Sequence, residues 1–117
     1  MRFMVIVKAT KDSEANKMPT PELLAAMGKF NEELVKAGVM LAGEGLRASS
    51  MGARVEFKGG KRTVVDGPFA ETKEQLGGYY LIEAKNLDEA TEIASRIPAV
   101  RLGSIEIRPV FEMQAAQ

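Results

Sequence analysis

The sequence predicts an α+β fold in which two helices cover one face of a single antiparallel sheet. Strand-like and helix-like segments follow one another in the order β-α-β-(β-β)-β-α-β. Both helical segments carry an apolar stripe at spacings of three and four residues, which is the period of a helix packed on one side. The chain has 117 residues, 45% apolar and 27% charged, a composition typical of one globular domain. We expect residues 1–112 to form this domain and residues 113–117 to be a terminal tail.

The first half of the chain begins with an alternating apolar strand at residues 2–8. The polar residues 11–18 predict a loop. Thr20 is a suitable N-cap and Pro21 a suitable first helical residue, so a helix is predicted from there to a cap at Gly38. Its inward stripe is Leu23, Met27, Phe30 and Leu34. A short, irregular strand is predicted over residues 39–46.

A β-hairpin is predicted around Gly59-Gly60, because two consecutive glycines favour the primed turns that match strand twist. The flanking strands are residues 55–58 and 61–65. In the register set by a two-residue loop, Val55 lies opposite Val64 and Phe57 lies opposite Arg62. We expect residues 70–75 to form at most one turn of helix.

The second half repeats the strand-helix-strand pattern. Residues 79–84 predict a strand that is apolar on both faces, with one of its two tyrosines facing the core. Asn86 and Glu89 have capping-box spacing, which predicts a helix that Pro98 ends. Its stripe is Leu87, Ala90, Ile93, Ala94 and Ile97. A closing strand over residues 103–110 completes the order of a ferredoxin-like sheet.

Two helices can cover only one face of this sheet, yet the strands at residues 2–8 and 79–84 are apolar on both. A second copy of the sheet, related by a two-fold axis, is the simplest cover for the other face. The sequence therefore predicts a homodimer, with a monomer as the alternative.

Composition excludes several kinds of chemistry. There is no cysteine and no histidine, which removes thiolate nucleophiles, the commonest general base and the commonest metal ligands. Sixteen basic residues balance sixteen acidic ones, which argues against nucleic acid or a membrane surface as partner. We also expect no metal and no cofactor, because neither a carboxylate ligand loop nor a glycine-rich nucleotide motif is present. With no export signal or apolar span, the expected location is the cytoplasm.

Residues 65–80, VDGPFAETKEQLGGYY, resemble the DGPF motif of the YCII-related domain family. The segments AGEGL at 42–46 and IEIRP at 105–109 extend the resemblance over nearly the whole chain. The resemblance implies a dimeric ferredoxin-like fold of the dimeric α/β barrel type. It also implies relatives that are small hydrolytic or lyase-type enzymes, one branch being linked to dehydrochlorination of chlorinated aromatics, and relatives with stress-linked or regulatory roles. The enzymatic branch is expected to use a His–Asp pair, which this histidine-free chain cannot supply.

Two carboxylates are candidate proton acceptors. Asp66 stands where a strand ends at a Gly-Pro turn, and Glu44 lies between two glycines that allow backbone to approach a ligand closely. Each is equally consistent with an ordinary turn residue. Candidate ligand contacts are Glu71, Lys73, Tyr80 and Arg108, for which surface ion pairs or core packing are the alternatives.

Two functions stay open at this point. The first is a dimeric small-molecule-binding domain with a regulatory or stress-linked role and no cofactor. The second is a cofactor-independent enzyme of hydrolase or lyase type, with a carboxylate base in a cleft beside the sheet.

Overall fold

The computed structural model describes residues 1–67, 76–98, 100 and 103–112. Four strands form one antiparallel sheet in the order β2-β5-β1-β6: β1 (Arg2–Lys8), β2 (Met40–Gly45), β5 (Leu76–Glu83) and β6 (Ile105–Pro109). This is the ferredoxin-like arrangement, so the predicted fold class is confirmed. The pairing of β2 with β5 shifts between Met40 and Ala42, which accounts for the irregular strand expected there.

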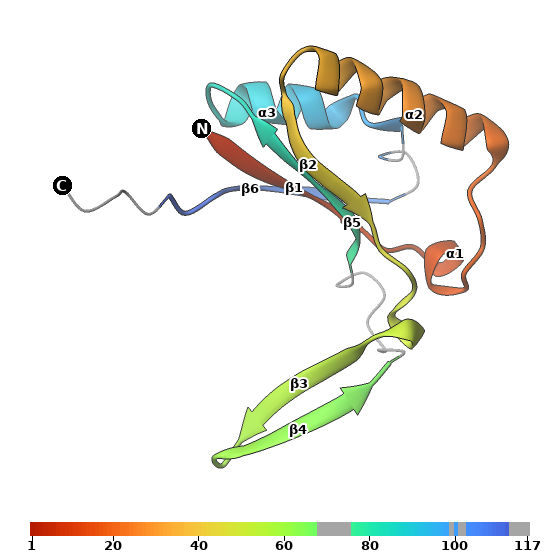
Figure 1. Cartoon of the computed structure of the whole chain (residues 1–117), viewed down its shortest axis with the longest axis vertical. Helices are drawn as coiled ribbons and strands as arrows, with labels where there is room; N and C mark the ends of the chain where they lie inside the picture. Colours follow the sequence, from red (N-terminus) through yellow and green to blue (C-terminus); the bar gives the residue numbers. More distant parts are fainter. Residues whose placement is uncertain (68–75, 99, 101–102, 113–117) are drawn as a thin grey trace.

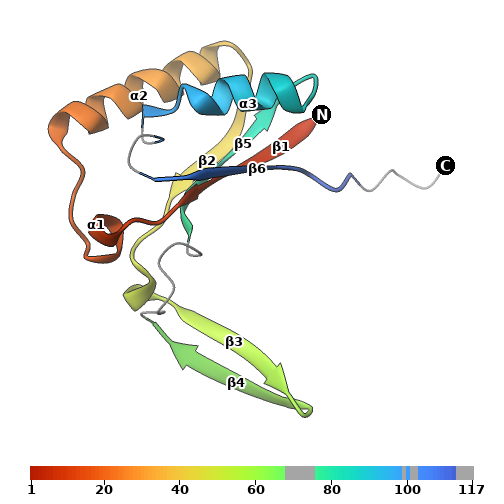
Figure 2. The ribbon, with the colours of Figure 1, turned by 180° about the vertical axis from the view of Figure 1, so that it is seen from behind.

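Two long helices, α2 (Pro21–Lys36) and α3 (Leu87–Ser95), lie on the same face of the sheet (Figures 1 and 2). The core is formed between them and the sheet. Its buried side chains include Phe3, Val5, Tyr80 and Ile82 from the strands, Phe30 and Leu34 from α2, and Ala90, Ile93 and Ala94 from α3. The predicted stripes therefore face inward, except that Leu87, the first residue of α3, remains exposed.

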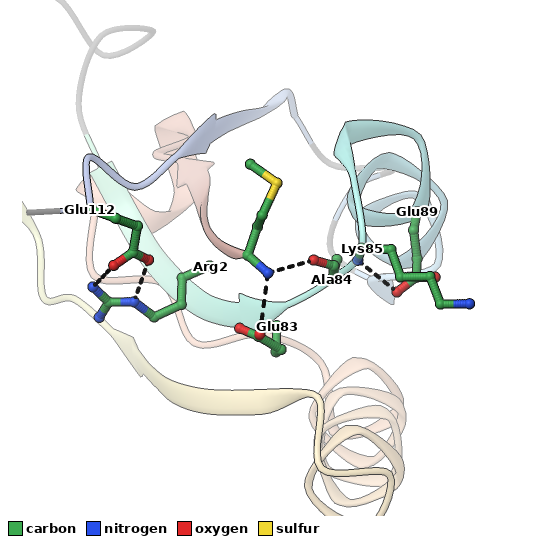
Figure 3. Close-up of polar contacts among 7 residues, drawn as sticks. Arg2, Glu83, Ala84, Lys85, Glu89 and Glu112 are labelled. Atoms are coloured by element: carbon green, nitrogen blue, oxygen red, sulfur yellow. Dashed lines mark hydrogen bonds and ion pairs between the residues drawn. The ribbon is translucent and has the colours of Figure 1, made fainter. Parts of the chain in front are cut away.

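The helix ends follow local chemistry. The Thr20 hydroxyl accepts a hydrogen bond from the Leu23 amide at 3.1 Å, and Gly38 follows α2 with a φ of +71°. The Asn86 side chain accepts from the Glu89 amide at 2.9 Å, as expected, but the Glu89 carboxylate accepts from the Lys85 amide instead of closing the box on Asn86 (Figure 3). The helix ends at Ser95, before Pro98.

The loop predicted over residues 11–18 is wrong in part, because Lys11–Glu14 form a one-turn helix, α1. Thr10 and Ser13 cap each other reciprocally: the Ser13 amide donates to the Thr10 hydroxyl and the Thr10 amide donates to the Ser13 hydroxyl. This local pair satisfies two first-turn amides, so a short helix forms without an apolar stripe.

The N-terminal end of β1 is fixed by polar contacts on both sides (Figure 3). The Met1 ammonium donates to the Ala84 carbonyl at 3.0 Å and pairs with the Glu83 carboxylate at 3.2 Å. The Arg2 guanidinium forms two hydrogen bonds with the Glu112 carboxylate. This bidentate contact raises the pKa of Arg2 and lowers the pKa of Glu112, mainly through the hydrogen bonds themselves.

Strands β3 (Ala53–Lys58) and β4 (Lys61–Asp66) form a separate two-stranded sheet that projects away from the four-stranded one (Figures 1 and 2). We call residues 53–66 the arm. Gly59 and Gly60 both have positive φ, at +57° and +79°, and the predicted register is confirmed throughout. The radius of gyration is 16.3 Å, whereas a compact chain of this length has a radius of gyration of about 13 Å.

The root of the arm is held by hydrogen bonds. The Gly67 amide donates to the Gly52 carbonyl at 3.0 Å, and the Glu14 carboxylate accepts from both the amide and the hydroxyl of Ser49. Ser49 begins a 3₁₀ turn, η1 (Ser49–Met51). Helix α1 therefore anchors the chain just before β3.

The sheet face opposite the helices carries Met4, Ile6, Tyr79 and Leu81, and we call these four residues the outer face. Met4 lies across from Leu81 and Ile6 across from Tyr79, and each is half-buried. Tyr80 lies on the helix side, so the prediction of one inward and one outward tyrosine is confirmed. Within the described ranges, no helix has the length and apolar character needed to cross a membrane.

Candidate functional site

A cavity of about 1410 Å³ lies between the N-terminal half of α2, the segment around α1, and the ends of β2 and β5. Its lining is mainly apolar and includes Val7, Leu23, Met27, Met40 and Ile97. Leu23 and Met27, in the first half of α2, are only half-buried, whereas Phe30 and Leu34 further along are buried. The inward stripe of α2 thus serves two purposes, with its second half in the core and its first half in the cavity wall.

Three glycines leave part of the sheet side of the cavity without side chains. Gly45 of β2 lies opposite Gly78 of β5, and Gly43 lies opposite Tyr80, so all three glycines are on the helix side. A Cβ at Gly78 would stand 2.8 Å from the Glu44 carbonyl oxygen, and one at Gly43 would meet the end of the Met40 side chain. The segment Gly43-Glu44-Gly45, whose glycines were expected to allow close approach to a ligand, is therefore part of the cavity wall.

Tyr80, which is buried, and Asn31, which is half-buried, supply polar groups beside this apolar space. The Tyr80 hydroxyl donates to the Asn31 side-chain oxygen at 2.5 Å, and the Tyr80 ring packs edge-on against Phe30 at a centroid distance of 6.4 Å. Burial raises the pKa of Tyr80, although the bond to Asn31 works in the opposite direction. The hydroxyl is therefore protonated at neutral pH, and the Asn31 amide retains two donor hydrogens.

Charged residues of both signs border the cavity: Lys8, Lys17, Arg96, Asp12, Glu22 and Glu44. Two of the cations are already paired, Lys8 with Glu106 at 3.5 Å and Arg96 with Glu92 at 3.2 Å. Lys17 has no ion pair within the described part of the chain. It is thus the cation at the cavity border that is available for an acidic group.

The predicted site residues do not converge. Tyr80 faces the cavity, and Glu44 borders it from the edge strand β2, although strand alternation places the Glu44 side chain on the same side as Tyr79. Asp66 is the last residue of the arm, paired with Ala53, and does not border the cavity. Arg108 is exposed on β6 and also lies outside the cavity lining. Glu71 and Lys73 lie outside the described residues.

The guanidinium of Arg108 pairs with a neighbouring carboxylate. Its guanidinium donates to Glu106 at 3.2 Å, and Lys8 approaches the other oxygen of that carboxylate. These contacts, the Arg108 hydrogen bond first, lower the pKa of Glu106. The sequence left a ligand contact or a surface ion pair open for Arg108, and the structure shows the surface ion pair.

Asn31 was not among the residues predicted for a site. Its place in α2, four residues after Met27 and next to Phe30, is on the edge of the inward stripe. The sequence signal that could have identified Asn31 is its position as a polar amide at the border of an apolar stripe. Its role depends on the hydrogen bond from Tyr80, which is 49 residues away in the chain.

A second cavity, of about 460 Å³, lies between α2 and α3. Its polar border consists of Glu33, Glu89, Glu92 and Arg96, and it contains none of the predicted site residues. Across the described residues, no group of three or more acidic side chains is placed to hold a metal ion.

Comparison with solved structures supports the fold. The dehydrochlorinase TftG of Burkholderia phenoliruptrix AC1100, which acts on 5-chloro-2-hydroxyhydroquinone and was solved with 2,5-dihydroxybenzoquinone, is similar with a TM-score of 0.54. The similarity covers 97% of this chain and 96% of that one, at 16% sequence identity. At this identity the likeness concerns the fold.

Sequence comparison identifies the family. An uncharacterised protein of Rhizobium meliloti (strain 1021), R00369, is 34% identical over 97 residues, which cover 81% of this chain and 78% of that protein. The family model of the YCII-related domain matches residues 1–114. The chain therefore belongs to the YCII-related domain family.

Proposed function

We propose that this protein is a dimeric domain that binds a small organic molecule in the cavity beside α2, in a regulatory or stress-linked role and without a cofactor. One observation carries the proposal: a part-buried Tyr80–Asn31 hydrogen bond lies at a mainly apolar cavity of about 1410 Å³. Ligand sites are commonly apolar hollows in which a few fixed polar groups set orientation.

The polar pair indicates which ligand chemistry fits. The free amide hydrogens of Asn31 can donate to a carbonyl oxygen, and the Tyr80 oxygen can accept from a hydroxyl. Met27 and Met40 provide flexible, polarisable walls that suit a flat ring. We therefore propose an aromatic or quinone-like ligand that bears carbonyl or hydroxyl groups. The dihydroxybenzoquinone bound to the structurally similar TftG belongs to this class.

The test is a binding titration with 2,5-dihydroxybenzoquinone and related hydroxylated rings, followed by amide chemical shifts. Saturable shifts should centre on residues of α2 and β5 around Asn31 and Tyr80. Tyr80→Phe should weaken binding about tenfold, because it removes one hydrogen bond in a site sheltered from water. Tyr79→Phe removes the same hydroxyl from the opposite face and is the matched control.

Two results would count against this site. One is binding that Tyr80→Phe and Tyr79→Phe weaken equally. The other is a set of shifts that maps away from α2, for example onto the helix–helix cavity around Glu92.

A second function rests on Glu44, the candidate carboxylate on the edge strand at the cavity border, whose side chain would have to turn from the Tyr79 side around that edge to reach a ligand. In this alternative the protein is a cofactor-independent enzyme of hydrolase or lyase type, with Glu44 as proton acceptor. Turnover of a ring ligand that Glu44→Gln abolishes while binding persists would support it. Glu32→Gln, on the solvent side of α2 and paired with Lys36, is the control. Binding without any turnover would favour the first function.

A further inference from the structure

We propose that the arm docks through one of its faces on a second copy of this chain. The inference rests on the proposed homodimer and adds a contact that the outer face does not provide. The register places Ala53, Val55, Phe57 and Val64 on one face of the arm, with Arg62 near the hairpin turn and Asp66 at the root as the charged residues of that face. Phe57 is 73% exposed, Val55 58% and Val64 55%, so this apolar face is uncovered in the single chain.

The opposite face of the arm has a different character. It carries Glu56, Lys58, Lys61 and Thr63, together with Arg54 and Val65. An arm with one mainly apolar and one mainly charged face is what a strand pair shows when one side is packed and the other is in water. A two-stranded hairpin is at best marginally stable alone, so an arm of this kind needs a surface to pack on.

The exposed area is large enough for a stable interface. The chain exposes 8549 Å², whereas a folded monomer of 12.7 kDa exposes about 6200 Å². The excess, about 2300 Å², is similar to what each chain of a large permanent dimer buries. The arm projects from the four-stranded sheet and adds exposed surface of its own (Figures 1 and 2).

The arm is held at its root before any partner binds. The Glu14 carboxylate binds both the amide and hydroxyl of Ser49, and the Gly67 amide donates to the Gly52 carbonyl. Because these contacts fix the direction in which the arm leaves the body, less conformational freedom is lost when it docks.

Charge favours a second copy as the occupant. The arm has four basic and two acidic residues, whereas the rest of the chain has twelve basic and fourteen acidic ones. The arm is thus net positive by two and the body net negative by two, so arm and body of different copies attract. In a two-fold dimer both arms make the same contact, which closes the assembly at two chains.

The experiment compares two double variants by light scattering over a range of concentrations. Val55→Thr with Phe57→Thr removes apolar surface from the docking face. Both new residues are threonine, which is β-branched and favours strands. Glu56→Gln with Thr63→Ser changes the other face and is the matched control. We expect the first to raise the dimer dissociation constant at least tenfold and the second to change it less than twofold. Equal curves for the two variants would overturn the inference.

A second measurement needs no disruptive change. Because the chain has no cysteine, Thr63→Cys gives a single attachment site for a spin label on the charged face. A docked arm predicts one narrow distribution of distances between labels on the two chains. A broad distribution within an intact dimer would overturn arm docking while leaving the proposed homodimer in place. A wild-type monomer would overturn both.

Discussion

The hydroxyl of Tyr80 donates a hydrogen bond to the side-chain oxygen of Asn31 and so joins the middle of the sheet to the middle of α2. The bond lies where the packed core gives way to the cavity. Its two ends come from segments that are adjacent in space but distant in sequence. We therefore expect both stability and the proposed ligand binding to depend on this contact.

Loss of the acceptor should be measurable in the titration of Tyr80. Burial raises the pKa of this phenol and the Asn31 bond partly offsets the rise, so Asn31→Leu should raise the pKa further. Tyr79→Phe gives a background in which Tyr80 is the remaining tyrosine, so absorbance reports on it alone. An unchanged or lower pKa in Asn31→Leu would contradict the geometry.

The same group predicts how stability falls at alkaline pH. Its folded-state pKa lies above the value of about 10 expected for an unfolded chain, so the protonated form is favoured by folding. The resulting stabilisation is complete below pH 10 and is lost as pH rises through the folded pKa. Urea unfolding of the wild type and of Tyr80→Phe between pH 9 and 11 would test this. The free energy of unfolding should fall more steeply with pH in the wild type than in the variant, which lacks the phenol.

Near neutrality, stability should be almost independent of pH, because the chain contains no histidine. On the acid side, Glu106 has a pKa lowered by Arg108 and Lys8. Its contribution is present above the unfolded pKa and disappears as pH falls through the folded one. Urea midpoints should be flat from about pH 6 to 8 and decline below about pH 4.5, with a smaller decline in Glu106→Gln. A transition centred near pH 6.5 would contradict this prediction.

Gly67 should tolerate no side chain. A Cβ there would overlap the carbonyl oxygen of Ser49, in the segment that Glu14 holds. Gly67→Ala should therefore destabilise the protein by about 1–3 kcal/mol, the usual cost of overpacking. Gly52→Ala, whose Cβ would lie 3.6 Å from the same oxygen, is the control and should unfold close to the wild type in urea.

The outer face gives a direct test of the proposed homodimer. Ile6 points away from the helices, whereas Ile82 is in the core. Ile6→Asp should therefore yield a folded monomer of 12.7 kDa in light scattering, because a buried carboxylate opposes association. Thr91→Asp, on the exposed side of α3, should retain the wild-type mass. Equal dimer content in both variants would argue against the outer face as the interface.

Features set by nearby residues were predictable. Thr20 and Pro21 define the start of α2 through their own backbone preferences, and Gly59-Gly60 set the hairpin register because both can adopt positive φ. The short helix α1 was missed because a Thr10–Ser13 cap outweighs the lack of an apolar stripe. Strand alternation predicted that one of Tyr79 and Tyr80 faces inward, and the structure decided that it is Tyr80.

The sequence by itself determined the order of elements, their polarity, and the absence of histidine and cysteine chemistry, since these depend on residue identity and local spacing. Only the tertiary structure decided that Asn31 meets Tyr80, that Glu44 borders the cavity while Asp66 does not, and that the arm leaves the body of the molecule. The physical reason is that side chains meet through the pairing of β1, β2 and β5 and the packing of α2 on them. Those long-range contacts join segments that are distant in the chain, and the sequence of one segment does not indicate which other segment it will pack against.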